Sequence, residues 1–146
     1  MLSTLMLISN TNISAASLML KYECHGCTDV TGFGIIGHAE NLAKVQTNTI
    51  DLKISRLPVI RDIPALVRKS GKFMKLFQGT SAETSGGLLM MLSKEKALAL
   101  QEELIMLEGM PSWIIGEVIS GNRAAFLDQE IEVIEVPEIE EEGYLW

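Results

Sequence analysis

Residues 28–34 read Thr-Asp-Val-Thr-Gly-Phe-Gly and continue over residues 35–39 as Ile-Ile-Gly-His-Ala. This stretch places one carboxylate, Asp29, in a turn-forming segment that leads directly into a helical pattern. Gly32 and Gly34 can adopt a positive φ at little cost, which permits a sharp turn and a close approach to a ligand. The start of a helix exposes unpaired N–H groups and a partial positive charge. The stretch therefore predicts a tight turn followed by a helix over residues 34–45.

Asp29 has two interpretations when only the residues are considered. A carboxylate beside a helix start can bind a divalent cation that also contacts phosphate oxygens. Asp is also a frequent capping and turn residue, and a single carboxylate does not make a metal site. The residues by themselves favour the capping or turn role.

Two further sequence blocks bear on the choice between the metal-binding and the capping role of Asp29. Residues 83–89 read Glu-Thr-Ser-Gly-Gly-Leu-Leu, and residues 113–118 read Trp-Ile-Ile-Gly-Glu-Val. Together with residues 28–39, and in this order, they resemble the C-terminal domain of selenophosphate synthetase (selenide, water dikinase). The similarity extends from about Asn10 to about Val136. The Thr-Ser-Gly-Gly-Leu block also occurs in aminoimidazole ribonucleotide synthetase and a hydrogenase maturation factor, but the combination of the three blocks is narrower.

The resemblance implies a reaction in which ATP, selenide and water give selenophosphate, AMP and phosphate with the help of Mg²⁺. It implies that Asp29 is the one metal ligand of the family in this sequence. It also implies that the nucleophilic cysteine or selenocysteine, its lysine and the ATP-binding domain belong to an N-terminal region absent here. ATP and selenide would bind together with that domain, and the full-length protein would be a homodimer. Further residues are predicted to shape the turn or to line the cleft between the domains: Thr28, Gly32, Gly34, Thr84, Ser85, Gly86 and Gly87.

Three hypotheses of function follow. The first is the C-terminal part of a selenide, water dikinase that is inactive by itself, because phosphoryl transfer depends on several positioned metals and basic groups. The second is a non-catalytic stand-alone paralogue or partner subunit of a full-length synthetase. The third is the same domain from a relative in purine or cofactor biosynthesis. Residues 84–87 also have a structural interpretation, as support for the strand that begins at Leu88.

Composition limits the classes of protein to consider. At 146 residues the chain is long enough for one core, so we expect a single domain over residues 1–137 and an acidic tail over residues 138–146. The formal net charge of −7 and the pI near 4.8 argue against nucleic-acid binding. No stretch is long enough to span a membrane, and a signal peptide is not evident, so a cytoplasmic protein is expected.

Cys24-His25-Gly26-Cys27 forms a C-x-x-C pattern. A structural zinc site needs four ligands, which the two histidines and this one pair do not supply in a usual spacing. A redox motif would open a helix after a strand. We therefore expect the two cysteines to be structural. His38 is likewise expected to be a packed histidine, and Trp113 a core anchor.

The hydrophobic periodicity predicts an α+β fold with a small mixed or antiparallel sheet covered by helices. Residues 2–21 are expected to be largely helical, with or without a break near residues 10–12, and the apolar residues 1–8 are interpreted as a short helix or strand buried against the core. Asp62 is expected to cap a helix that ends at Lys69, and residues 72–86 to form an irregular loop. Ser93 is expected to cap a helix whose buried face is Ala97, Leu100, Leu104 and Leu107. Strands are expected at residues 49–55, 88–92, 113–119, 123–127 and 131–136, with a hairpin turn at Gly121-Asn122.

Overall fold

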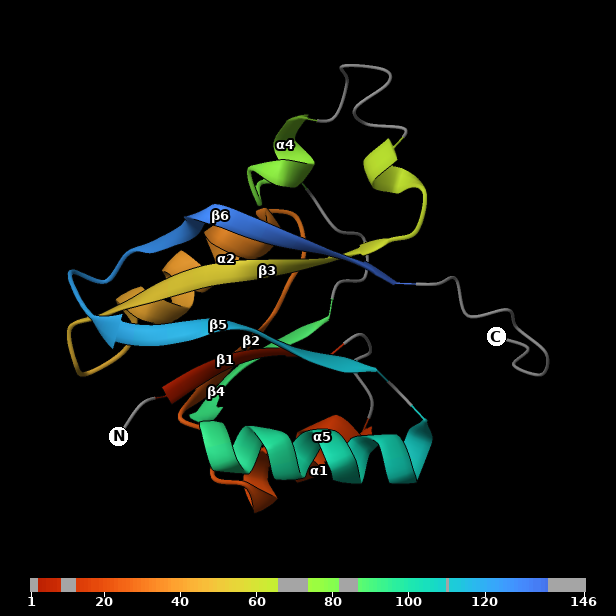
Figure 1. The fold of residues 1–146 in the computed structure, drawn as a ribbon. Coiled ribbons are helices and arrows are strands. Elements are labelled where there is room, and N and C mark those ends of the chain that lie inside the picture. Colours follow the sequence, from red (N-terminus) through yellow and green to blue (C-terminus); the bar gives the residue numbers. More distant parts are fainter. Residues whose placement is uncertain (1–2, 9–12, 66–73, 82–86, 110, 137–146) are drawn as a thin grey trace.

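The computed structural model describes residues 3–8, 13–65, 74–81, 87–109 and 111–136. Strands and helices alternate irregularly along the chain (Figure 1). The elements are β1 (Ser3–Ile8), α1 (Ile13–Lys21), β2 (Gly26–Asp29), α2 (Gly34–Lys44), β3 (Ile50–Ile60), α4 (Met74–Phe77), β4 (Leu88–Ser93), α5 (Lys94–Glu108), β5 (Ser112–Ser120) and β6 (Ala125–Val136).

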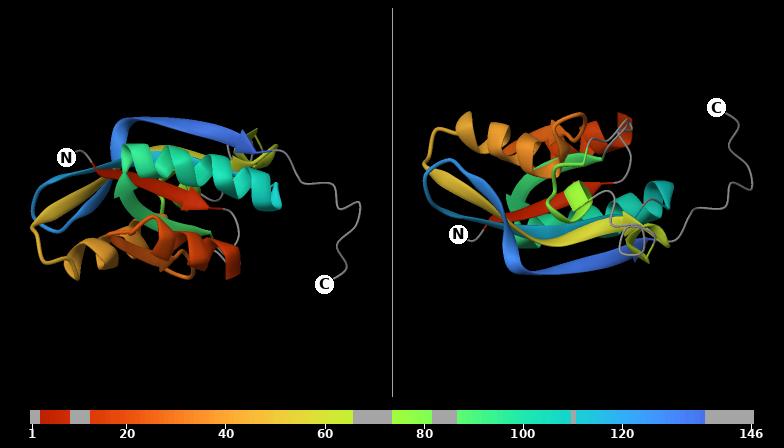
Figure 2. Two further views of the ribbon diagram at one scale, coloured as in Figure 1. Left: turned by 90° about the horizontal axis from the view of Figure 1, so that it is seen from below. Right: turned by 90° about the horizontal axis from the view of Figure 1, so that it is seen from above.

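Six strands form one mixed sheet in the order β2-β4-β1-β5-β3-β6. Every neighbouring pair is antiparallel except β3 and β6, which run parallel. The expected α+β fold with a mixed sheet is therefore confirmed. Figure 1 shows α1 and α5 together below the sheet, and both views in Figure 2 place α2 to one side of β3 and β6.

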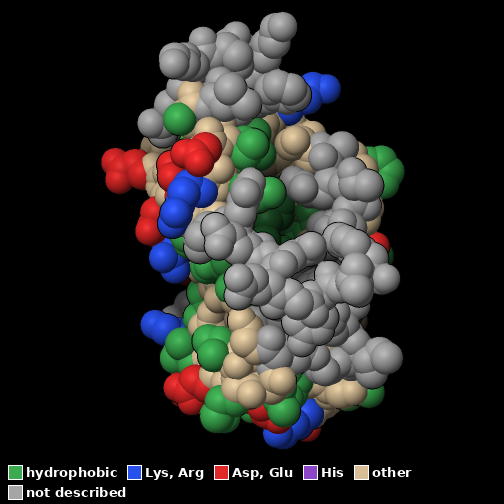
Figure 3. Space-filling view, turned by 90° about the vertical axis from the view of Figure 1, so that its right-hand side faces the viewer, with side chains coloured by type: hydrophobic (Ala, Val, Ile, Leu, Met, Phe, Trp, Pro, Cys, Tyr) green, Lys and Arg blue, Asp and Glu red, His purple; other side chains and the backbone are tan. Residues whose placement is uncertain are grey.

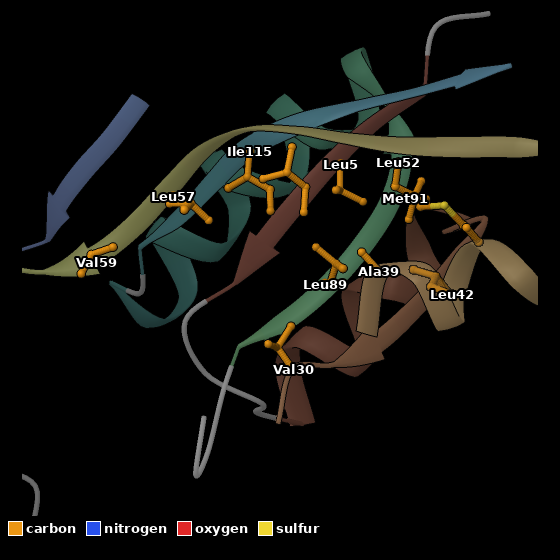
Figure 4. Packing of buried hydrophobic residues seen from close by; sticks show 12 residues of the cluster. Leu5, Val30, Ala39, Leu42, Leu52, Leu57, Val59, Leu89, Met91 and Ile115 are labelled. Atoms are coloured by element: carbon orange, nitrogen blue, oxygen red, sulfur yellow. The ribbon is translucent and has the colours of Figure 1, made fainter. Parts of the chain in front are cut away.

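Two apolar clusters hold the layers together because strand side chains alternate between the two faces of a sheet. The first cluster packs the inner face of the sheet against α2, and Figure 4 shows Leu89 and Met91 of β4 facing Ala39 and Leu42 of α2. The second cluster packs the opposite face of β1 and β4 against α1 and α5. Since α2 contacts both edge strands, β2 and β6, the sheet curves around this helix.

Residues 3–8 form β1, so the strand interpretation of the N-terminal apolar stretch is confirmed and the helical one is wrong. This strand lies between β4 and β5, and both of its faces are covered by helices. Leu5, Met6 and Ile8 are consequently almost completely buried. A strand that is apolar on both faces shows no alternation, so its pattern cannot be distinguished from that of a buried helix.

The hairpin predicted at Gly121-Asn122 is also wrong. β5 and β6 are not neighbours, because β3 lies between them. The two short strands expected at residues 123–127 and 131–136 are one continuous strand, β6. A register shift opposite Ile54 and Arg56 of β3 carries the pairing past the polar residues 128–130, which had indicated a break.

Other elements agree with the sequence prediction in their main features. β3 begins where expected but continues to Ile60. The side chain of Ser93 accepts a hydrogen bond from the backbone N–H of Lys96 and so caps α5 as predicted. Leu107 is 60% exposed and does not belong to the buried face of α5. The short helix α4 lies within the segment expected to be irregular.

Two expectations are only partly covered by the structure. Residues 63–65 are helical, but Asp62 has a positive φ of 70° rather than the extended backbone of an N-cap, and Lys69 lies outside the described residues. The acidic tail at residues 138–146 also lies outside them. In the described part of the chain, helices are too short or too polar to cross a membrane.

Candidate functional site

The three sequence blocks meet at one end of the sheet. Thr28 of β2 pairs with Leu89 of β4, Leu89 pairs with Leu7 of β1, and Leu7 pairs with Trp113 of β5. Each block thus supplies one residue to a single row that crosses four strands, and β1 supplies the remaining one. Val30, which follows β2, donates its backbone N–H to the carbonyl oxygen of Gly87 at 3.0 Å. Segments far apart in the sequence are therefore joined directly.

Asp29 is the last residue of β2, and its side chain is exposed. It does not cap α2, because the N-cap residue is Phe33 and makes no side-chain capping bond. No hydrogen bond or ion pair within the described residues engages its carboxylate. The negative charge still acts locally, since it adds to the effect of burial in raising the pKa of Cys27. The Asp29 carboxylate therefore keeps its hydrogen-bonding capacity available, as far as the described residues are concerned.

The start of α2 is not open to an anion from every side. Gly34 has a φ of 69°, as the sequence predicted, and a Cβ there would lie 2.7 Å from the carbonyl oxygen of Gly79 and 2.8 Å from that of Ser81. The N–H of Ile36 donates to the Gly79 carbonyl oxygen at 3.0 Å. Backbone oxygens of residues 79–81 therefore cover this part of the helix start. Gly32 does not adopt a positive φ, and a Cβ there would meet no atom of the described residues within 4 Å.

Gly87 fulfils the structural interpretation of the second block. A Cβ at Gly87 would lie 2.0 Å from the carbonyl oxygen of Ile8, so the close approach of these two backbones excludes any larger residue. Thr84, Ser85 and Gly86 lie outside the described residues, and their role at a cleft stays a prediction. Thr28 donates its hydroxyl to the carbonyl oxygen of Asp29 at 3.1 Å.

His38 is a packed and satisfied histidine, as expected. It is 8% exposed, and its Nε2 lies 3.1 Å from the hydroxyl of Thr31. The ring of Phe33 lies beside it, with the ring centroids 5.4 Å apart. Phe33 itself is 69% exposed. Trp113 is partly buried against the first apolar cluster, which agrees with its predicted role in the core.

The two cysteines are free and half-buried. The thiol of Cys24 donates to the carbonyl oxygens of Gly26 and Met91 at 3.1 and 3.3 Å. Burial raises the pKa of both thiols, which keeps them protonated and disfavours thiolate chemistry. Across the described ranges, no three His, Cys, Asp or Glu side chains gather closely enough to hold a metal ion. These contacts agree with a structural role for the pair.

A hollow of about 240 Å³ lies beside the row of paired residues, and Figure 3 shows hydrophobic side chains on its floor. It was not predicted from the sequence, since its lining comes from seven separate segments. Its walls are mainly aliphatic, with Trp113 as their one aromatic side chain within the described residues. Leu7 and Trp113, which belong to that row, are part of its lining, as is Val30, which follows β2. The hollow therefore adjoins the end of the sheet that presents Asp29.

Comparison with known proteins identifies the family. Residues 6–129 match the domain family described as AIR synthase related protein, C-terminal domain. The chain belongs to this family. The structure of a HypE–HypF complex has the same fold, with a TM-score of 0.61, 16% sequence identity, and coverage of 90% of this chain and 50% of that chain.

Within the AIR synthase related family, curated relatives with high sequence identity are selenide, water dikinases. The probable selenide, water dikinase of Caenorhabditis elegans is 49% identical over 115 residues, which are 76% of this chain and 30% of that protein. Selenide, water dikinase 2 of Mus musculus is 47% identical over 128 residues, which are 86% of this chain and 28% of that protein. The resemblance to the C-terminal domain of selenophosphate synthetase is therefore confirmed, and the chain spans about a third or less of the curated relatives it matches.

Proposed function

We propose that this chain is the C-terminal part of a selenide, water dikinase and that it contributes Asp29 to a Mg²⁺ site shared with an ATP-binding half. The observation that carries the proposal is the exposed Asp29 carboxylate at the end of the sheet where the three family blocks meet. It is supported by the identity of 40–49% to selenide, water dikinases over most of the chain. The substrates would be ATP and selenide, and the products selenophosphate, AMP and phosphate.

The residues present fit a single-ligand contribution to a magnesium site. Mg²⁺ is commonly bound by one or two protein carboxylates, by substrate phosphates and by several waters. One exposed carboxylate without a described partner meets that requirement, whereas a complete site within the described residues does not exist. When bound, Mg²⁺ would neutralise charge on the phosphates. Asp29 would hold its negative charge at the cleft, and the β2–α2 turn would fix its direction.

The remaining parts of the reaction would come from the other half of the enzyme. Cys24 and Cys27 are poor candidates for the nucleophile, because burial raises the pKa of both thiols and Cys24 is engaged with two carbonyl oxygens. The nucleophile, its lysine and the phosphate-binding loop are accordingly assigned to the ATP-binding half. A homodimer and a cytoplasmic location are part of the same proposal, by analogy with the full-length family.

The test compares the isolated chain with a chimera in which this chain replaces the matching region of Mus musculus selenide, water dikinase 2. AMP formation is followed with ATP, Mg²⁺ and selenide. We expect selenide-dependent AMP from the chimera and none from the isolated chain. In the chimera, Asp29→Asn should lower the rate by about two orders of magnitude or more, because positioned charge carries much of the transition-state stabilisation.

Three outcomes would contradict the proposal. AMP formation by the isolated chain would show that the chain carries a complete active site. A folded chimera that binds ATP but makes no AMP would favour the non-catalytic paralogue. Full activity in the Asp29→Asn chimera would remove the metal assignment while leaving the family assignment intact.

A further inference from the structure

The turn between β2 and α2 is held by a small set of contacts centred on His38. This residue lies in the second turn of α2, and its Nε2 is 3.1 Å from the hydroxyl of Thr31, two residues after Asp29. Because the imidazole is 8% exposed, loss of this partner would leave a largely buried polar atom unpaired. The bond therefore ties the exposed turn to the helix.

Phe33 and Gly37 add a second contact at the same place. The Phe33 ring lies against the His38 ring at an interplanar angle of 50°. A Cβ at Gly37 would lie 2.7 Å from the Cβ of Phe33, so the missing side chain lets Phe33 approach the helix. The aromatic pair and the Thr31 bond thus clamp residues 31–33 onto the first two turns of α2.

Within the described residues, the other hydrogen bonds of this turn are made by the backbone: the N–H of Val30 donates to the carbonyl oxygen of Gly87, and the N–H of Gly34 to that of Thr31, both at 3.0 Å. The N-cap of α2 makes no side-chain capping bond, although such a bond commonly fixes the entry of a chain into a helix. The Asp29 carboxylate has no described donor that would orient it. In the described part of residues 29–34, the Thr31–His38 contact is the one hydrogen bond between two side chains. The direction of the Asp29 side chain must therefore be set by the backbone around it. Strand β2 fixes the backbone before Asp29, and the turn held by His38 fixes the backbone after it.

We propose that His38 is a positioning residue for Asp29: its bond to Thr31 fixes the β2–α2 turn and so sets the carboxylate that binds Mg²⁺. The inference rests on the proposed function of Asp29. It assigns His38 a role beyond packing, since outer partners that orient a metal ligand change metal affinity or activity by about 10- to 100-fold when removed. A residue that only packs would change stability without a specific effect on the metal.

The experiment uses the chimera described above. Thr31→Val removes the hydroxyl and keeps the shape, His38→Phe removes the bond and keeps a ring, and His38→Gln keeps a polar atom for Thr31. The Mg²⁺ concentration that gives half of the maximal rate is measured together with the melting temperature. Ser93→Ala is the control, because it removes a hydroxyl that also makes a hydrogen bond at a helix start, the cap of α5, away from the turn.

We expect Thr31→Val and His38→Phe each to raise the required Mg²⁺ concentration about tenfold. The double variant should be no worse than either single one, because both remove the same bond. His38→Gln should recover much of the loss, and Ser93→Ala should lower the melting temperature without changing the Mg²⁺ requirement. If His38→Phe does not fold, Thr31→Val still tests the bond from its more accessible side.

Two different failures are distinguishable. If Asp29→Asn raises the Mg²⁺ requirement but Thr31→Val and His38→Phe only lower the melting temperature, as Ser93→Ala does, the positioning role is wrong and the proposed function stands. If Asp29→Asn leaves the Mg²⁺ requirement unchanged, the metal assignment is wrong and the positioning role falls with it.

Discussion

Two aspartates on strands of the same sheet have opposite surroundings. Asp51 of β3 accepts hydrogen bonds from the backbone N–H groups of Asn122 and Ala124 at 2.7 and 2.9 Å, both at Oδ1. Asp29 at the end of β2 accepts none within the described residues. The Asp51 carboxylate stabilises the connection between β5 and β6, whereas the Asp29 carboxylate is exposed on the surface. The comparison shows that residue type and strand position do not separate a structural carboxylate from an available one, whereas the donors around each do.

The same contrast extends to the glycines beside the two aspartates. A Cβ at Gly121 would lie 2.0 Å from the carboxylate carbon of Asp51, so the connection closes tightly around that side chain. A Cβ at Gly32, three residues after Asp29, would lie more than 4 Å from every atom that the structure describes outside its chain neighbours. The connection at Gly121 is filled by the Asp51 carboxylate, whereas the turn after Asp29 has no described neighbour at Gly32.

The largest effect is expected at Gly34, where the turn after Asp29 joins the rest of the fold. Gly34→Ala forces a side chain onto a residue with a φ of 69° and into the carbonyl oxygens of residues 79 and 81. The left-handed backbone and the overlap together should lower the free energy of unfolding by about 2 to 4 kcal/mol. Urea denaturation of the two proteins measures this difference.

Gly32→Ala is the control in the same turn. It should change the free energy of unfolding by less than about 0.5 kcal/mol, because a Cβ at Gly32 would contact no described neighbour and the φ of this residue is not positive. Equal losses at Gly32 and Gly34 would show that the turn is packed as tightly at Gly32 as at Gly34.

A smaller loss is expected at Asp51. Asp51→Ala removes the acceptor of two backbone N–H groups, and the one on Ala124 is partly buried. The free energy of unfolding should fall by about 2 kcal/mol. Asp51→Asn should lose less, since a single oxygen accepts both bonds and an amide oxygen can replace it. An unchanged midpoint of urea unfolding for Asp51→Ala would mean that this carboxylate does not stabilise the fold.

The smallest effect concerns an ion pair near Asp51. The ammonium group of Lys53 lies 2.7 Å from Asp128, and this bond lowers the pKa of the Asp128 carboxyl and raises the pKa of Lys53. A lowered carboxyl pKa adds stability above the unfolded value of about 3.9, and that stability disappears as the pH falls through the folded value. A raised ammonium pKa adds stability below about 10.4, which is lost as the pH rises through the folded value.

Asp128→Asn should therefore lower the melting temperature slightly at neutral pH, and the difference from the unchanged protein should begin to shrink near pH 4 and disappear as the pH falls through the lowered pKa of Asp128. Thermal unfolding followed by circular dichroism between pH 3 and pH 8 provides the measurement. Glu130→Gln removes the same charge from an exposed neighbour without a described ion-pair partner, so it should show no such pH dependence. A difference for Asp128→Asn that persists in acid would assign the effect to something other than the ion pair.

The sequence predicted most of the helices and buried strands because their signals are local. The cap at Ser93 and the apolar face at Ala97, Leu100 and Leu104 lie within one helix, and all are confirmed. β1 could not be distinguished from a helix by its own residues, because the helices that cover its two faces, α1, α2 and α5, lie elsewhere in the sequence. The β5–β6 hairpin was misassigned because Asp51, about seventy residues earlier, holds the connection.

In the candidate site, too, features that depend on local sequence were predictable and features that depend on the arrangement of the strands were not. The turn before α2 and the positive φ of Gly34 were predictable, since glycine requirements are local. The row from Thr28 to Trp113 was not, because it depends on the order of four strands. The clamp of Thr31 by His38 was also missed, although a spacing of seven residues across a helix start could have indicated it. Whether Asp29 binds Mg²⁺ stays a prediction.

The central claim is that Asp29 is available for a ligand whereas Asp51 is part of the fold. The most direct measurement makes the same substitution, Asp→Ala, at each position in the chimera and records both the Mg²⁺ requirement of AMP formation and the melting temperature. We predict opposite results: Asp29→Ala raises the Mg²⁺ requirement or abolishes the rate with an unchanged melting temperature, and Asp51→Ala lowers the melting temperature with an unchanged Mg²⁺ requirement. An Asp29→Ala chimera that melts as early as Asp51→Ala, or that needs no more Mg²⁺ than the unchanged chimera, would contradict the account.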